Sequence, residues 1–262
     1  MNRRIKSPIV GGNWKMYNTM SQSLDYVRRL RSLLEDEEQT RAFVLMPFTV
    51  LYAVKTLMAQ INCRVSIGAQ DAFWEDRGAY TGEVSSAMLS EVGCKFVLLG
   101  HCERRRFFFE TDETVNRKAR AALRHALTPI ICIGETLVER ETGQTEEKIH
   151  RQVAATLDGL TATEVQQCII AYEPIWAIGT DQTPRVERVE EVHSLIRALL
   201  KQKYYDEAGQ SIRIIYGGSV HLDNCVELAR GENVDGLFVG RDSLDPVTFA
   251  QIIRAACAGT SG

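Results

Sequence analysis

The segment Cys168-Ile-Ile-Ala-Tyr-Glu-Pro-Ile-Trp-Ala-Ile-Gly-Thr180 decides the fold of this chain. It begins as an apolar run that ends in one carboxylate, Glu173, and Pro174 follows directly. Because proline cannot donate to a sheet ladder, the predicted strand ends there and a loop begins. A carboxylate that closes a buried strand is costly unless it has a partner or a chemical role. Taken alone, the segment favours a salt-bridged strand end over a general base beside a movable loop.

Seven more segments of strand length accompany this one. Most are continuously apolar rather than alternating, as is typical of parallel strands that are buried on both faces. The eight predicted strands are Pro8–Asn13, Ala42–Pro47, Val65–Gln70, Lys95–Gly100, Pro129–Gly134, Cys168–Glu173, Arg213–Gly217 and Val234–Gly240.

Segments with helical periodicity lie between these strands. Apolar residues recur every three or four positions over Leu24–Leu34 and again over Val189–Leu200. Strands that alternate eight times with helices predict a single (β/α)8 barrel domain over residues 1–262. The alternative is a doubly wound open sheet, which is weakened by the absence of a G-x-G-x-x-G motif after the first strand.

Composition and charge narrow the classes of function. The net charge of −3 argues against nucleic acid or an anionic membrane as the main partner. No apolar stretch reaches the roughly 18 residues of a membrane span, and the basic N-terminus lacks the apolar core of a signal peptide. The 7 cysteines contain no C-x-x-C pair, which favours reduced thiols in a cytoplasmic protein. The histidines lack metal-ligand spacing, so we expect no metal site and no cofactor.

Polar residues and glycines follow several of the predicted strands. In a (β/α)8 barrel the functional residues sit at the carboxyl ends of the strands and in the loops that follow. The residues at those ends are Asn13 and Lys15 after the first strand, His101 and Glu103 after the fourth, Glu173 after the sixth, and Gly217, Gly218, Ser219 and Gly240 after the last two. Each alone has an ordinary structural interpretation, but the barrel brings all of them to one end.

Four motifs at these strand ends closely resemble the triosephosphate isomerase family. They are Asn13-Trp-Lys-Met16, Gly100-His-Cys-Glu-Arg-Arg105, Ala171-Tyr-Glu-Pro-Ile-Trp176 and Tyr216-Gly-Gly-Ser-Val220, in this order. The resemblance extends from about Gly11 to about Leu244. It implies a homodimeric enzyme without a cofactor that interconverts an aldose phosphate and a ketose phosphate.

The resemblance also implies a role for each catalytic residue. Glu173 would be the base that moves a proton between neighbouring carbons. His101, as a neutral imidazole, and Lys15 would stabilise the enediolate oxygen, with Asn13 as a further polar contact. Glu103 would accept a hydrogen bond from Lys15 and hold its ammonium group in place.

The phosphate of the substrate would rest on backbone N–H groups near a helix N-terminus. By the same resemblance these groups belong to Gly179, Ser219 and Gly240.

In the family a long third loop, here Gln70–Glu83, enters a pocket of the twin subunit. Thr81 and Glu83 match the residues that make this contact, and Arg104 matches the arginine that pairs with the glutamate across the interface. As an independent surface loop, this segment would expose Phe73, Trp74 and Tyr80, which is unusual unless a partner covers them.

Three positions depart from the family pattern. Cys102 stands where the family has the serine that receives the catalytic carboxylate when the lid is open, and a thiol is a weaker donor. In the family, the residue at the position of Pro184 donates its backbone N–H to the tyrosine that matches Tyr216 when the lid closes. Proline has no N–H to donate. Arg241 replaces a glycine of the phosphate loop, so its side chain either points outward or extends substrate recognition.

These departures leave the substrate more open than the reaction class. Relatives that act on four-carbon sugar phosphates such as erythrulose phosphate share the barrel and the catalytic residues. A Schiff-base aldolase that uses Lys15 is a second alternative. A non-catalytic phosphate sensor is a third, and the presence of Glu173 argues against it because a sensor needs no base.

Overall fold

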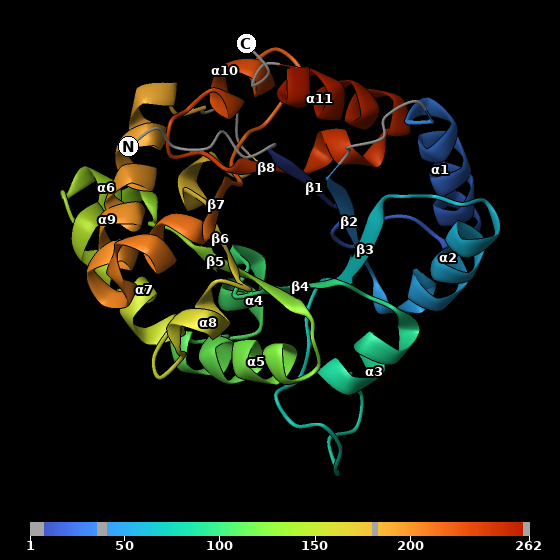
Figure 1. Cartoon of the computed structure of the whole chain (residues 1–262), viewed down its shortest axis with the longest axis horizontal. Helices are drawn as coiled ribbons and strands as arrows, with labels where there is room; N and C mark the ends of the chain where they lie inside the picture. The colour runs from blue at the N-terminus through green and yellow to red at the C-terminus, as the bar shows by residue number, and fades with distance from the viewer. Residues whose placement is uncertain (1–7, 36–40, 180–182, 259–262) are drawn as a thin grey trace.

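A closed barrel of eight parallel strands forms the centre of the molecule, in a computed structural model that describes residues 8–35, 41–179 and 183–258. The strands follow one another around the barrel in chain order, and β1 closes it by pairing with β8 (Figure 1). The predicted (β/α)8 barrel is therefore confirmed. The strands are β1 (Ile9–Asn13), β2 (Ala42–Met46), β3 (Ser66–Ala69), β4 (Phe96–Leu99), β5 (Thr128–Ile133), β6 (Ile169–Tyr172), β7 (Arg213–Tyr216) and β8 (Gly236–Val239).

Helices surround the barrel and cover its outer face (Figure 1). They are α1 (Met20–Leu33), α2 (Phe48–Gln60), α3 (Ser86–Val92), α4 (Cys102–Phe107), α5 (Asp112–Arg124), α6 (Leu137–Glu141), α7 (Thr145–Thr156), α8 (Ala162–Val165), α9 (Val186–Ser211), α10 (Cys225–Ala229) and α11 (Pro246–Ala258). Two short 3₁₀ turns, η1 (Ile175–Ala177) and η2 (Arg241–Leu244), follow β6 and β8. None of the described helices is long and apolar enough to cross a membrane.

Two apolar layers explain why the strands are apolar on both faces. Side chains such as Phe43, Leu98 and Ile130 fill the inside of the barrel. Side chains of alternate positions, such as Val44 and Leu99, point outward and pack against the helices. Since successive residues of a strand face opposite sides, both sets must be apolar, and the alternation that marks a half-exposed strand is absent.

The predicted strands are longer than the observed ones at several ends. The fourth and sixth strands end at Leu99 and Tyr172, one residue earlier than predicted, whereas the first ends at Asn13 as predicted. Strand β5 begins at Thr128, one residue earlier than predicted. His101 and Glu173 thus lie just beyond the pleated backbone, where the chain turns away from the barrel.

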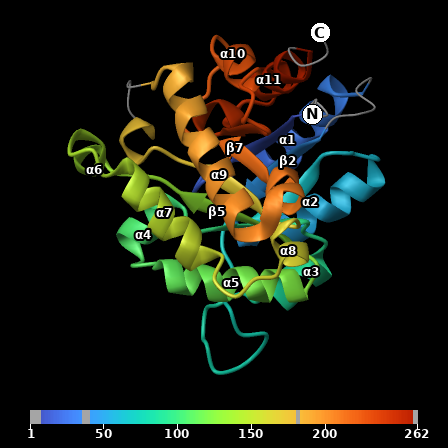
Figure 2. The same ribbon diagram turned by 60° about the vertical axis from the view of Figure 1, so that its left-hand side comes forward.

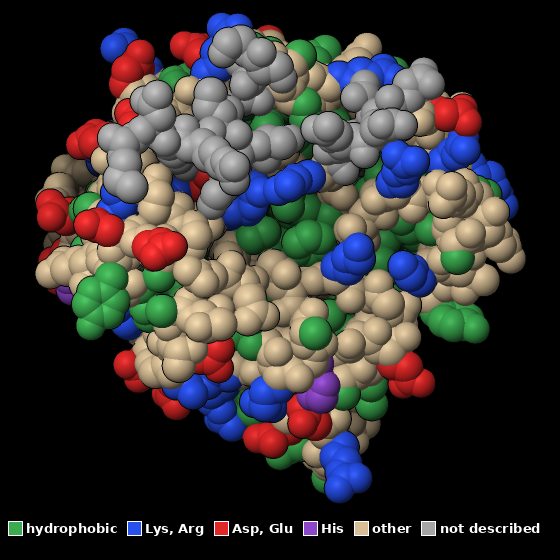
Figure 3. All heavy atoms as spheres, in the orientation of Figure 1, with side chains coloured by type: hydrophobic (Ala, Val, Ile, Leu, Met, Phe, Trp, Pro, Cys, Tyr) green, Lys and Arg blue, Asp and Glu red, His purple; other side chains and the backbone are tan. Residues whose placement is uncertain are grey.

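The segment between β3 and α3 is the most prominent projection of the fold. It extends away from the barrel as a long loop in both ribbon views (Figures 1 and 2). On the face shown in Figure 3, basic and acidic side chains both occur around the periphery. That distribution fits a chain with a small net charge.

Candidate active site

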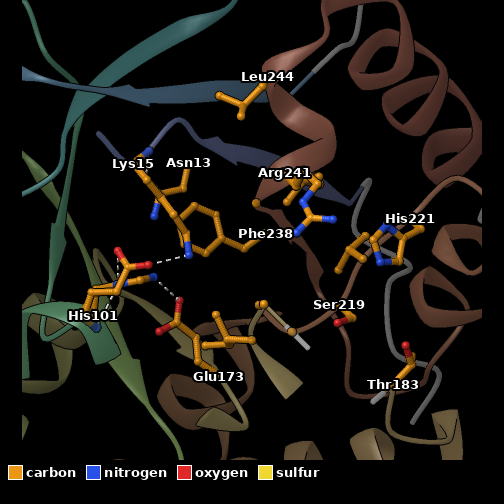
Figure 4. A pocket seen from close by; sticks show the side chains of 18 of the residues that line it. Asn13, Lys15, His101, Glu173, Thr183, Ser219, His221, Phe238, Arg241 and Leu244 are labelled. Carbon is orange, nitrogen blue, oxygen red and sulfur yellow. Dashed lines mark hydrogen bonds and ion pairs between the residues drawn. The ribbon is translucent and has the colours of Figure 1, made fainter. Parts of the chain in front are cut away.

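A pocket of about 510 Å³ opens at the carboxyl ends of the strands. Figure 4 shows Lys15, His101 and Glu173 on one side of it and Arg241, His221 and Ser219 on the other. Eleven of the residues predicted from the sequence line this pocket: Asn13, Lys15, His101, Glu103, Glu173, Gly179, Gly217, Gly218, Ser219, Gly240 and Arg241. The barrel therefore brings together residues that are distant in the sequence.

Glu173 lies at the floor of the pocket and is only 2% exposed. Its backbone N–H donates to the carbonyl of Ile133 on the neighbouring strand at 2.8 Å. A Cβ atom at Gly134 would lie 1.8 Å from the Glu173 carbonyl oxygen, so only glycine permits this close approach. Burial raises the pKa of the Glu173 carboxyl, against the attraction of nearby Lys15.

His101 is fixed by its position at the start of α4. Its Nδ1 accepts the backbone N–H of Glu103 at 3.2 Å, so the ring proton lies on Nε2. That Nε2 atom is 3.6 Å from Oε1 of Glu173 (Figure 4). The neutral ring therefore presents a donor to the same space that the carboxylate faces.

Lys15 occupies an uncommon backbone conformation, with φ of 51°. Its side-chain Nζ donates to Oε1 of Glu103 at 2.6 Å, and its backbone N–H donates to Oδ1 of Asn13 at 2.9 Å. A left-handed conformation costs a residue other than glycine about 1–3 kcal/mol, and such strain clusters at functional sites. The strain places the ammonium group in the pocket, within reach of a bound oxygen.

Gln70 holds the turn after β1 and was not among the predicted site residues. Its side-chain Nε2 donates to the Lys15 carbonyl at 2.8 Å and lies 3.3 Å from Oδ1 of Asn13. The signal was present, because Gln70 is the polar residue that closes the third apolar run, as Glu173 closes the sixth.

Glu135 is a second buried carboxylate at a strand end, and no sequence motif singles it out. It lies just after β5 and accepts hydrogen bonds from the Tyr172 hydroxyl at 3.1 Å and from Trp176 Nε1 at 2.9 Å. The guanidinium of Arg140 stacks over the Trp176 ring at 3.7 Å. These contacts anchor η1, where the chain leaves Glu173 and enters the predicted lid.

The opposite side of the pocket is formed by backbone and by a basic side chain. Gly179, Ser219 and Gly240 line it, and the Ser219 hydroxyl donates to the Ala177 carbonyl at 2.8 Å. Arg241 begins η2 directly after Gly240 and also lines the pocket. Its side chain therefore does not point away from the pocket (Figure 4). Residues 180–182 of the predicted lid lie outside the described residues.

His221 lines the same side of the pocket as Arg241. Its Nδ1 is 2.9 Å from Oδ2 of Asp242, the residue after Arg241. Histidine was not predicted here because His221 lies beyond the Gly-Gly-Ser motif rather than within it.

The supporting residues lie behind the pocket. Cys102 is the first residue of α4, and its Sγ is 3.9 Å from Nδ1 of His101. Burial raises the pKa of the Cys102 thiol, and the nearby Glu173 carboxylate raises it further. Burial likewise raises the pKa of Tyr216, at the end of β7. Among the described residues, His101, Cys102 and Glu173 are a group whose ligand atoms lie close enough to hold a metal ion.

The residues predicted to contact a twin subunit lie apart from the pocket. Thr81 and Glu83 are exposed on the projecting loop. Arg104 on α4 pairs within its own chain, with its Nη2 2.7 Å from Oδ2 of Asp71. Phe73 and Trp74 are only partly exposed, with their rings stacked 4.1 Å apart, whereas Tyr80 is 45% exposed, as expected of an independent loop.

Comparison with known proteins agrees with this geometry. A model of the triosephosphate isomerase family matches residues 8–256. Triosephosphate isomerases of Moorella thermoacetica and Geotalea uraniireducens are 47% and 45% identical, each over 250 residues that cover 95% of this chain and 99% of the relative. A crystal structure of triosephosphate isomerase from Bartonella henselae has a TM-score of 0.84 and 34% identity, covering 95% of this chain and 98% of that one. The chain therefore belongs to the triosephosphate isomerase family.

Proposed function

We propose that this chain is a triose-phosphate isomerase that interconverts glyceraldehyde 3-phosphate and dihydroxyacetone phosphate. The carrying observation is that the buried Glu173 carboxylate faces the Nε2 donor of His101 at 3.6 Å inside one pocket. Lys15 lines the same pocket and supplies a positive charge. A base and two donors around one space are what proton transfer beside a carbonyl requires.

The reaction moves one proton between two carbons and one proton between two oxygens of the bound substrate. The Glu173 carboxylate removes a proton from the carbon next to the carbonyl, and the electron pair of that bond shifts so that the carbonyl oxygen becomes an enediolate oxygen. The Nε2–H of His101 and the ammonium of Lys15 stabilise the developing negative charge. Glu173 then returns its proton to the former carbonyl carbon, while the proton of the neighbouring hydroxyl passes by way of His101 to the enediolate oxygen and leaves the new carbonyl behind. Since the electron pairs stay in the substrate, no external oxidant is required.

Burial makes the Glu173 carboxylate a stronger base, which favours removal of a proton from carbon. Its pKa is raised because the charged form is poorly solvated in the pocket floor. A stronger base transfers a proton from carbon more readily, provided that it is still ionised at the working pH.

The phosphate-binding end completes the proposal. We assign the phosphate to the backbone N–H groups of Gly179, Ser219 and Gly240, and the positive charge beside them to Arg241. The segment after Glu173 would then act as a lid over the bound phosphate. Loop closure of this kind is already well known from this enzyme family.

A side-by-side assay tests both the reaction and the substrate. Turnover of glyceraldehyde 3-phosphate and of erythrulose phosphate would be measured with the wild-type chain and with Glu173→Gln. We expect turnover of the triose phosphate, and its loss in the variant. A strong preference for the four-carbon substrate would reject the triose assignment, and equal activity of the variant would reject Glu173 as the base. Borohydride trapping of substrate on Lys15 would instead indicate an aldolase.

We also propose that the chain works in the cytoplasm as a homodimer of single-domain subunits. Phe107, Phe108 and Phe109 follow one another beside α4 and are 59%, 65% and 84% exposed. Three neighbouring exposed aromatic rings favour a surface that a partner covers. Sedimentation of the wild-type chain and of a Thr81→Arg variant tests this, since we expect a dimer that the bulky charge weakens.

A further inference from the structure

His221 is held beside the phosphate end of the pocket by both its backbone and its side chain. It lies two residues beyond Ser219, in the loop between β7 and α10. Oδ1 of Asn224 accepts the backbone N–H of His221 at 2.8 Å, and Nδ2 of Asn224 donates to the Ser219 carbonyl at 2.9 Å. Nδ1 of the ring is 2.9 Å from Oδ2 of Asp242 on η2. These contacts fix the imidazole relative to Ser219.

The contact with Asp242 determines which ring nitrogen of His221 carries the proton. A carboxylate accepts hydrogen bonds and donates none, so the proton of the neutral ring lies on Nδ1. Nε2 has no hydrogen bond to any residue that the structure describes, and the ring lines the pocket. The neutral ring can only accept at Nε2. As an imidazolium it donates to Asp242 through Nδ1 and to an anion in the pocket through Nε2.

Arg241 places a positive charge on the same side of the pocket. Figure 4 shows its side chain and that of His221 across the pocket from Lys15. Within the described ranges of the chain, the Arg241 guanidinium has no ion pair or hydrogen bond. The Lys15 ammonium, in contrast, is paired with Oε1 of Glu103 at 2.6 Å. The charge of Arg241 is therefore available to a bound anion.

We propose that Arg241 and the imidazolium form of His221 bind the phosphate of the substrate through their side chains, with Asp242 as the residue that positions the imidazole. The proposal rests on the proposed isomerase function, which supplies a phosphate ester as the ligand. A phosphate dianion only accepts hydrogen bonds, so it takes one from Nε2–H and others from the guanidinium. When the dianion meets the neutral ring, the ring takes up one proton from solvent. These contacts add to the backbone N–H groups already assigned to the phosphate.

Other titratable or charged groups face the same pocket. Besides Arg241 and Asp242, those among the described residues are Lys15, Tyr17, His101, Glu103 and Glu173. Histidines and buried carboxyls can change charge over the same range of pH. A pH effect on anion binding is therefore assigned to His221 only where a chain that lacks this ring differs from the wild type.

Sulfate binding tests the side-chain contacts without any assay of turnover. Sulfate alone would be titrated calorimetrically into the intact chain and into His221→Asn and His150→Asn at about pH 6 and about pH 8, since sulfate keeps both charges over this range whereas histidine titrates. His150 is exposed on α7 and serves as the matched control. At about pH 6 we expect sulfate to bind about tenfold more weakly to His221→Asn than to the wild type, and equally to His150→Asn.

The second pH value separates the charge of the ring from its shape. At about pH 8 the wild type should lose its advantage over His221→Asn, because the neutral ring has no proton on Nε2. Asp242→Asn removes the charged partner of the ring, so its affinity at the lower pH should fall between those of the other two chains. An affinity equal to that of the wild type would overturn the role of Asp242. Equal affinities of the wild type and His221→Asn at about pH 6, or the same advantage at both pH values, would overturn the proposal.

Steady-state kinetics tests whether the contact is made to the phosphate of the substrate. Proton transfer leaves the phosphate group unchanged, so a contact with it acts alike on the bound substrate and on the transition state. His221→Asn and Arg241→Gly should each raise KM for glyceraldehyde 3-phosphate about tenfold and leave kcat within about twofold. A fall in kcat with an unchanged KM would overturn the proposal. If the isomerase assignment failed, none of the chains would turn over this substrate, whereas the sulfate affinities would still differ between the wild type and His221→Asn.

Discussion

Glu135 and Glu173 occupy equivalent places on neighbouring strands yet differ in their partners. Glu173 is the first residue after β6 and Glu135 the second after β5, and both are buried, at 2% and 0% exposure. Glu135 accepts hydrogen bonds from a tyrosine hydroxyl and a tryptophan N–H. Glu173 has one oxygen 3.6 Å from an imidazole and the other without a partner among the described residues. A carboxylate with satisfied oxygens is fixed as a structural group, whereas one left short of donors remains available as a base.

The most direct test of this difference is to replace each carboxylate in turn with a neutral amide. In Glu173→Gln the base is lost while the shape is retained, so kcat should fall by about 10²–10⁴-fold. Steady-state kinetics with glyceraldehyde 3-phosphate would measure this. A fall of similar size in Glu135→Gln would mean that the two sites do not differ as we propose.

Glu135→Gln should act mainly on stability. Oε1 accepts from both Tyr172 and Trp176, and the amide oxygen of glutamine can take its place, so both donors keep an acceptor that has lost its charge. Because a hydrogen bond to a charged group contributes about 1.5–3 kcal/mol and one between neutral groups about 0.5–1.5 kcal/mol, the unfolding free energy should fall by about 1 kcal/mol. Urea unfolding of this variant beside the wild type would measure the loss, and an unchanged midpoint would contradict it.

The pH dependence sharpens the contrast further. Because burial raises the pKa of Glu173, kcat/KM should fall as the pH is lowered through that raised pKa. The sign for stability is opposite. A carboxyl whose pKa is raised on folding favours the fold below its unfolded pKa, and this contribution disappears as the pH rises through the folded pKa.

Unfolding of the wild type and of Glu173→Gln over a pH series checks that sign. The advantage of the glutamine variant should grow as the pH rises from about 4, the ordinary pKa of a glutamate. An advantage that shrinks over this range would show that Glu173 is stabilised as an anion.

The smallest expected effect concerns the far end of the lid. Pro184 is buried and has no N–H to offer Tyr216. Pro184→Ala would restore a donor worth about 0.5–1.5 kcal/mol, so kcat/KM should rise about two- to tenfold. Arg185→Ala, next to it and exposed, is a suitable control. An unchanged value in Pro184→Ala would mean that closure does not use this bond.

The barrel could be predicted from the sequence because each of its strands is recognisable from its own residues. Each strand such as β6 is a short apolar run, and each active-site residue follows such a run, so counting runs placed Asn13, His101 and Glu173 at one end. The motifs then gave these residues proposed roles. Strand ends were less accurate, since the point where Tyr172 leaves the ladder depends on its neighbours in the barrel.

Contacts between distant segments were not predictable in this way. Nothing in the sequence pairs Glu135 with Trp176 or Gln70 with Lys15, because those contacts depend on the curvature of the barrel.

The left-handed backbone of Lys15 has a consequence for how this barrel could change over generations. Glycine adopts that conformation without strain, so it is favoured at this position once the ammonium group is no longer needed, and its greater freedom in the unfolded chain offsets only part of the relief. In a lineage that keeps the barrel but abandons the proposed chemistry, position 15 should therefore be among the first of the proposed catalytic positions to change.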